Sequence, residues 1–97
     1  MNDNAQTAML LKIAASAIEA SQLARAAAAE KHDLRQAYRD HKEMVGVKKV
    51  ERNTPEWSAM LAATVGEYAV SKAAKQQAQN ATRRLQTAIR RYENSAL

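Results

Sequence analysis

The chain has 97 residues, no cysteine and a net charge of +5, and its hydrophobic share of 46% includes no phenylalanine. A chain of this length forms one domain, and the lack of cysteine excludes both a disulfide framework and a thiolate metal site. Much of the apolar content is alanine, which buries little area, so we expect a thin core in the monomer. We expect a cytoplasmic protein.

The first twenty residues predict neither a signal peptide nor a membrane span. Their apolar patch, residues 9–13, is interrupted by Lys12, and acidic Asp3 precedes it. A signal peptide needs a basic leader and an unbroken apolar run. No stretch of the chain approaches the roughly 20 apolar residues of a membrane helix, so we expect no membrane partner.

The first predicted helix covers about residues 4–45, because no glycine or proline occurs before Gly46. Alternating steps of three and four residues from Leu10 trace an apolar seam with a polar break at Lys31. The predicted seam is Leu10, Ile13, Ala17, Ala20, Ala24, Ala27, Lys31, Leu34, Tyr38, His41 and Val45. Within residues 14–29, alanine occurs on all sides of the predicted helix. Alanine has the highest helix propensity, so the segment could simply be a stiff rod, or its small side chains could pack on more than one face, and we favour the second explanation.

Stop and start signals define a loop at about residues 46–54. Gly46 follows the helical run, with cationic Lys42 in its last turn, which is typical of a left-handed C-cap. Thr54 can cap a new helix whose first residue is Pro55. Residues 47–52 are β-branched enough to form a short extended segment, which could pair with its copy in a dimer, but we favour an irregular turn.

The second predicted helix covers about residues 55–94. Gly66 lies within it and costs about 1 kcal/mol relative to alanine, so we expect a close helix crossing there as compensation. The predicted seam is Trp57, Leu61, Thr64, Tyr68, Ser71, Lys75, Ala78, Thr82, Leu85, Ile89 and Tyr92, widened by Met60, Val65, Ala74, Ala81 and Ala88.

Folding the chain at the loop pairs residues whose numbers sum to about 101, which brings the polar break at Lys31 close to Ser71 and Lys72. The two seams then agree, so the fold class is all-α: two long antiparallel helices in a helical hairpin of coiled-coil type, residues 1–97 forming one domain. Two such helices cannot cover both of their apolar faces. We therefore predict a homodimer that forms a four-helix bundle.

The sequence shows no catalytic or cofactor motif. His32 and His41 do not share a helix face, and no cysteine, and no histidine four residues from either of them, completes a metal site. Acid-base catalysis needs carboxylates whose pKa values are shifted within a cleft, and the sequence indicates no such cleft. We predict no enzyme activity, no cofactor and no metal.

The strongest charge pattern is a basic stripe on the second helix. Residues 57–97 carry six basic and two acidic side chains, and Lys72, Lys75 and Arg83 recur at helical spacing, on the side roughly opposite the seam. Such a stripe suits the phosphate backbone of DNA or RNA, although a solvated helix face is also usually charged. No aromatic residue interleaves it, so base stacking is not predicted. The candidate nucleic-acid-binding residues are Lys72, Lys75, Arg83, Arg84, Arg90 and Arg91.

The bulkiest apolar cluster follows the loop. It is either core at the closed end of the hairpin or an anchor for another protein, because Trp and Tyr dominate interface hot spots. The candidate partner-binding residues are Trp57, Met60, Leu61 and Tyr68, with the loop cations Lys48, Lys49 and Arg52.

The segment Val50–Met60, followed by Ala62–Thr64, Glu67–Tyr68 and Ala81–Leu85, resembles small helical proteins carried by bacterial phages and prophages. The resemblance implies a phage-type setting in the host cytoplasm and no particular activity. The hairpin is also similar in shape to the plasmid RNA-binding Rop proteins, without a shared motif.

These observations predict a non-enzymatic helical interaction protein that binds nucleic acid, or a protein that handles nucleic acid, through the basic face of its second helix. The alternative is a phage-encoded inhibitor of a host enzyme or defence complex, similar in kind to anti-CRISPR proteins, which docks on a host protein complex.

Overall fold

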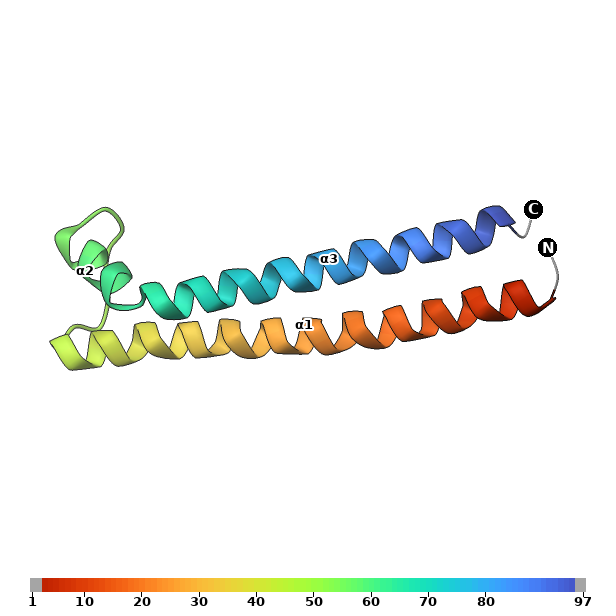
Figure 1. The fold of residues 1–97 in the computed structure, drawn as a ribbon. Helices are drawn as coiled ribbons and strands as arrows, with labels where there is room; N and C mark the ends of the chain where they lie inside the picture. The colour runs from red at the N-terminus through yellow and green to blue at the C-terminus, as the bar shows by residue number, and fades with distance from the viewer. Residues whose placement is uncertain (1–2, 96–97) are drawn as a thin grey trace.

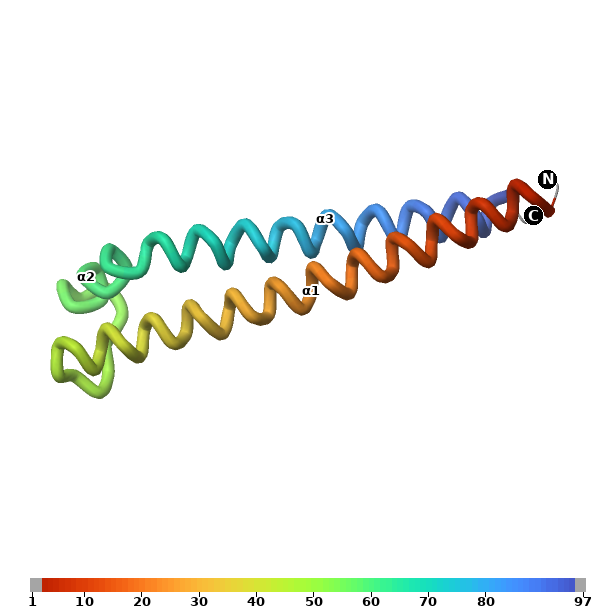
Figure 2. The backbone as a smooth tube through the Cα atoms, turned by 60° about the horizontal axis from the view of Figure 1, so that its bottom comes forward, coloured from red at the N-terminus to blue at the C-terminus, as the bar shows by residue number. Residues whose placement is uncertain are grey.

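The computed structural model describes residues 3–95 of the protein as three helices: α1 (Asp3–Val45), α2 (Pro55–Ala63) and α3 (Val65–Ser95). The long helices α1 and α3 run antiparallel along each other, and α2 lies at the closed end of the hairpin (Figure 1). The molecule is a rod with dimensions of 66 × 20 × 18 Å. Figure 2 shows the two long helices side by side from a second direction. The predicted all-helical fold with two long packed helices is confirmed.

The C-terminal end of α1 is closed by the glycine that the sequence indicated. Gly46 has a φ of +79°, which is the left-handed conformation. Its N–H donates to the carbonyl of Glu43 at 3.2 Å, and the N–H of Val47 donates to the carbonyl of Lys42 at 3.0 Å. These two bonds form a Schellman motif, which satisfies carbonyls that the helix end would otherwise leave unpaired.

The N-terminal end of α2 is capped by Thr54. Its hydroxyl oxygen accepts a hydrogen bond from the backbone N–H of Trp57 at 3.2 Å and donates to the carbonyl of Glu51 at 2.7 Å. Pro55 is the first residue of α2, as expected. Asn53 adopts a left-handed φ of 61°, which the sequence analysis did not predict. Residues 47–52 form no strand in the chain and follow an irregular path.

The prediction of one continuous second helix is wrong, because the helix is interrupted at Thr64. This residue is only 3% exposed, and its hydroxyl donates to the carbonyl of Met60 at 2.8 Å. Its backbone N–H also points to the carbonyls of Met60 and Leu61, at 3.1 and 3.3 Å. A threonine that bonds back to the preceding turn often bends a helix, although Thr82, which donates to the carbonyl of Ala78 in the same way, leaves α3 continuous. The bend lets α2 turn away from the axis of α3 at the end of the rod (Figure 1).

The expected close helix crossing at Gly66 is also absent. A Cβ atom added at this position would meet no atom within 4 Å. Gly66 stands in the first turn of α3, directly after the break at Thr64, rather than in the interior of a long helix. The cost of glycine there needs no compensation from a neighbouring helix.

The seam between the long helices follows a strict heptad pattern, and on each helix it shares one of its two columns with the predicted seam. The partly buried positions of α1 include Ile13, Ser16, Ala20, Leu23, Ala27, Glu30, Leu34, Ala37 and His41. Those of α3 are Ser71, Ala74, Ala78, Leu85, Ala88, Tyr92 and Ser95, together with Asn80 beside them, and Ala81 in the same seam is buried. The predicted seam positions that are exposed instead are Leu10, Ala17, Ala24, Lys31, Val45, Tyr68, Lys75, Thr82 and Ile89. Alanine occurs in several neighbouring columns, so it does not mark which column faces the partner helix.

Two contacts between the helices are close to the predicted register. Arg84 pairs with Glu19, and the hydroxyl of Ser95 lies 3.4 Å from the sulfur of Met9. Both contacts fall within about one turn of the expected alignment. The positions of the loop and the caps therefore predict the register of the two helices. They do not predict which columns of each helix face the other.

The core of the single chain is very small. In residues 3–95 the only buried hydrophobic residues are Met60 and Ala81, and no large side chain is fully buried. Most alanines of residues 14–29 are exposed; Ala20 and Ala27 are the partly buried ones. In one chain this segment thus packs on one face only.

Candidate nucleic-acid interface

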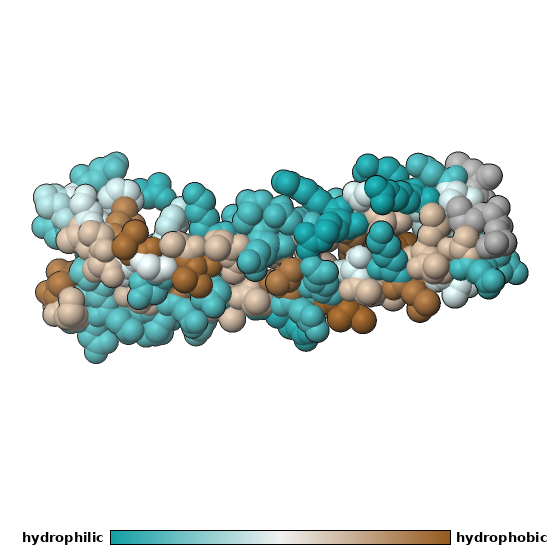
Figure 3. Space-filling view, viewed as in Figure 1, coloured by the Kyte–Doolittle hydropathy of each residue, from teal (hydrophilic) through white to brown (hydrophobic). Residues whose placement is uncertain are grey.

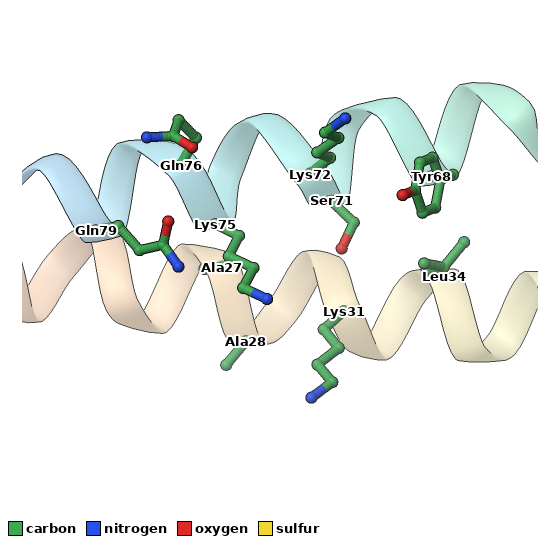
Figure 4. A pocket seen from close by; sticks show the side chains of 10 residues that line it. All are labelled: Ala27, Ala28, Lys31, Leu34, Tyr68, Ser71, Lys72, Lys75, Gln76 and Gln79. Carbon is green, nitrogen blue, oxygen red and sulfur yellow. The ribbon is translucent and has the colours of Figure 1, made fainter.

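A groove lies on one side of the seam between α1 and α3, near the middle of the rod. Its volume is about 620 Å³. The floor contains the small seam residues Ala27 and Ser71, and longer side chains from both helices form its walls (Figure 4). The hollow exists because small residues at the seam cannot fill the space between long side chains. The lining residues are Ala27, Ala28, Lys31, Leu34, Tyr68, Ser71, Lys72, Lys75, Gln76 and Gln79.

The charges that line this groove are all positive. Lys31 comes from α1, and Lys72 and Lys75 come from α3, whereas no lining residue is an aspartate or glutamate. Figure 4 shows the side chain of Lys75 extending from α3 across α1. Lysines that share a groove without acidic neighbours produce a local positive potential, which attracts polyanions.

The groove continues along the same side of the molecule. A second hollow shares Ala27, Lys75 and Gln79 with the first and adds Arg83 and Gln86. Its lining residues also contain no acid. The extended surface, here called the basic groove, therefore combines four cations with three glutamine amides. Ammonium, guanidinium and amide groups all donate hydrogen bonds to phosphate oxygens.

The six predicted nucleic-acid-binding residues are all exposed, but they do not share one face. Lys72, Lys75 and Arg83 line the basic groove, directly beside the seam rather than opposite to it. Arg84 instead pairs with Glu19 of α1 at 2.5 Å. Arg91 follows Arg84 by seven residues and so occupies the same column of the helix. Three of the six predicted residues thus line the basic groove, and Arg90, seven residues after Arg83, lies in the same column as Arg83.

The structure adds two residues that the sequence analysis did not assign to the basic stripe. Lys31 was treated as a polar break in the first seam, yet it supplies the α1 wall of the groove. The predicted proximity of Lys31, Ser71 and Lys72 was the available signal, and it is confirmed because all three line the same hollow. The ring of Tyr68, 51% exposed, also lines the groove, so an aromatic side chain does accompany the lysines.

No protein-family model matches the chain, and comparisons with curated proteins and with solved structures also found no match. The basic groove must therefore be interpreted from its own chemistry.

The apolar cluster after the loop divides between α2 and α3. Met60 is buried, and Trp57 and Leu61 are partly buried, whereas Tyr68 is half exposed. This burial favours a structural role for the α2 members, because α2 packs against both long helices. The loop cations of the predicted docking surface, Lys48, Lys49 and Arg52, are exposed.

The remaining candidates carry no comparable geometry. His32 is exposed and His41 is partly buried, and residues 3–95 contain no cluster of three or more metal-ligating side chains. The buried Nδ1 of His41 has no hydrogen-bond partner. Among the helices described, none has an apolar stretch that would cross a bilayer.

Proposed function

We propose that this protein is a non-enzymatic helical interaction protein that binds the phosphate backbone of nucleic acid in its basic groove. The observation that carries the proposal is the position of Lys31, Lys72 and Lys75, from two helices, around one hollow without acidic lining residues. Solvation of the helix surfaces alone gives no reason for cations from both helices to line the same hollow. The proposal replaces the predicted stripe on one helix by a site built from two.

Binding of this kind is electrostatic and independent of base sequence. Each lysine that neutralises a phosphate releases condensed counterions, so the affinity falls steeply with added salt. The amides of Gln76 and Gln79 also line the hollow and can position a strand by neutral hydrogen bonds. The groove runs along the rod, which suits a ligand with regularly repeated charges.

The test is fluorescence anisotropy with labelled DNA and RNA oligonucleotides over a series of salt concentrations. The variant combines Lys31→Gln, Lys72→Gln and Lys75→Gln. If each lysine contacts one phosphate, the slope of log affinity against log salt becomes shallower by about 2 to 3, because a contact contributes about 0.7 to 0.9.

The matched control combines Lys48→Gln, Lys49→Gln and Arg52→Gln, which removes the same charge from the exposed loop. We expect it to retain most of the affinity. Absence of binding at low salt would refute the proposal, and so would an equal loss in both triple variants, since that would show a response to net charge alone.

We also propose that the hairpin acts as a homodimer, in a phage-type setting. The support for the dimer is the small core of the chain, in which only Met60 and Ala81 are buried hydrophobic residues within the described range. The support for the setting is the sequence resemblance of residues 50–85.

The second candidate function is inhibition of a host protein complex by docking of the closed end. Its support is the exposure of the loop cations Lys48, Lys49 and Arg52 and of the ring of Tyr68. The test is capture from a nuclease-treated host lysate by the wild-type chain and by the loop triple variant. Capture that is the same for both proteins would exclude the loop as the docking surface.

A further inference from the structure

Building on the homodimer proposed above, we infer that the outward face of the N-terminal half of α1 is the self-association surface that binds the second copy of this chain. The face, here called the α1 patch, is centred on Leu10, Leu11, Ala14 and Ile18 and continues through Ser21 to Ala28. Leu10, Leu11 and Ile18 are 47%, 67% and 60% exposed. Hydrophobic surface is visible along the outer edge of α1 in Figure 3.

The exposed area of the single chain matches the requirement of a stable dimer. The chain exposes 7323 Å² for a mass of 10.7 kDa. A compact monomer of this mass exposes about 5,500 Å², so the excess is about 1,800 Å². Obligate homodimers bury roughly 1,000 to 2,500 Å² from each copy. The excess area falls within that range.

Charge is nearly absent from the α1 patch. Between Leu10 and Ala29 the charged residues are Lys12, Glu19 and Arg25. Lys12 and Glu19 are seven residues apart and lie on the column that faces Arg84, away from the patch. Arg25, four residues after Ser21 and three before Ala28, is the one charged residue between Leu10 and Ala29 that lies within the patch. Apolar surface of this extent on one helix indicates an interaction site rather than a solvated face.

The distribution of side-chain size fits an antiparallel pair of α1 helices. The large side chains of the patch stand at its beginning, and small ones, Ser21, Ala24 and Ala28, stand at its end. In a two-fold dimer the same surface meets itself. An antiparallel arrangement places Leu10 and Leu11 of one copy against the small residues of the other, so large side chains pack into small ones.

The α1 patch ends where the basic groove begins, because Ala28 lines that groove. The groove itself is unsuitable as a symmetric interface, since two copies would bring their lysines together. A second copy on the patch instead leaves Lys31, Lys72 and Lys75 accessible. Dimerisation and polyanion binding therefore use adjacent surfaces that meet at Ala28.

The experiment measures the mass of the full chain by light scattering at tens of micromolar protein. The test variant is Leu11→Glu with Ile18→Glu, and the control is Val65→Glu with Val70→Glu, because these α3 residues are 64% and 51% exposed. We expect the wild type and the control to have twice the mass of one chain and the test variant to have the mass of one chain. Circular dichroism shows whether each variant keeps its helices, and Leu11→Ala with Ile18→Ala replaces any variant that unfolds.

A second measurement tests the antiparallel arrangement. The chain has no cysteine, so mixing Leu10→Cys with Ala28→Cys and oxidising gives a mixed disulfide only if these positions meet across the interface. A monomeric wild type, or equal dissociation of the control variant, would overturn the proposal. Cross-linking of like positions only would overturn its antiparallel arrangement.

Discussion

Arg84 of α3 and Glu19 of α1 form an ion pair at 2.5 Å on the side of the seam away from the basic groove. The two side chains are 56% and 52% exposed, so water screens the pair and its contribution to stability is small, below about 1 kcal/mol. The pair nevertheless separates Arg84 from the lysines that precede it by nine and twelve residues. Arg84, which the sequence analysis grouped with the basic residues of the second helix, thus lies on a different face from Lys72 and Lys75.

The first prediction concerns this separation. Arg84→Gln should weaken oligonucleotide binding less than Lys75→Gln does, because Arg84 is already paired with a carboxylate and lies outside the groove. Both changes remove one positive charge, so each serves as the control for the other. The measurement is anisotropy at one low salt concentration. A larger effect of Arg84→Gln would contradict the proposed location of the site.

The second prediction concerns the ring of Tyr68, which lines the groove next to the lysines. If a base stacks on it, Tyr68→Leu should weaken single-stranded binding by about 5-fold or more, since a stacked base contributes about 1 to 3 kcal/mol. Tyr68→Phe keeps the ring and should retain the affinity. Duplex binding should change little, because its bases are already stacked. Equal losses with both strand types would argue against stacking.

The third prediction compares the two glycines. Gly46→Ala should destabilise the protein by roughly 1 to 2 kcal/mol, because its φ of +79° is unfavourable for a residue with a Cβ atom. Gly66→Ala should stabilise it by up to about 1 kcal/mol, because the added Cβ meets nothing within 4 Å. Urea denaturation monitored by circular dichroism measures both. Opposite signs are the essential result.

The fourth prediction concerns the cap of α2. Thr54→Ala should reduce the free energy of unfolding by about 1 kcal/mol, because it removes the oxygen that accepts from the N–H of Trp57. Thr87→Ala is the control: Thr87 is exposed within α3, where alanine has the higher helix propensity. The control should leave stability unchanged or slightly raised. A similar loss in both variants would remove the cap as the cause.

The fifth prediction concerns Ala81, which is 1% exposed at the seam. Ala81→Leu should destabilise the hairpin by about 1 to 3 kcal/mol, because the larger side chain forces the helices apart. Ala73→Leu adds the same volume at an exposed position of α3 and should have little effect. The comparison by urea denaturation tests whether α1 and α3 approach as closely as the alanines of the seam permit.

The turn of the hairpin was predictable from local signals alone. Gly46 and Thr54 act through hydrogen bonds to residues within a few positions of themselves, so their roles do not depend on the rest of the fold. The approximate register follows from the same signals. The caps define where both helices meet the loop, and each residue advances a helix by the same rise, so positions at equal distances from the loop face each other.

The break at Thr64 and the phase of the seam could not be obtained in this way. Thr64 interrupts the helix and is buried at the closed end. Threonine also occurs within continuous helices, so its presence in the sequence does not predict a break. Alanine in neighbouring columns gives no difference in burial energy large enough to select one of them.

The sequence by itself determined that this chain is a helical hairpin, where it turns, and that its second half is basic. Only the tertiary structure decided which cations act together, because a groove between two helices depends on the rotation of each helix about its own axis. That rotation places Lys31 beside Lys72 and Lys75 and places Arg84 against Glu19. The spacing of charges along one helix contains no information about the rotation of the partner helix. The assignment of cations to the groove therefore required the positions of both helices.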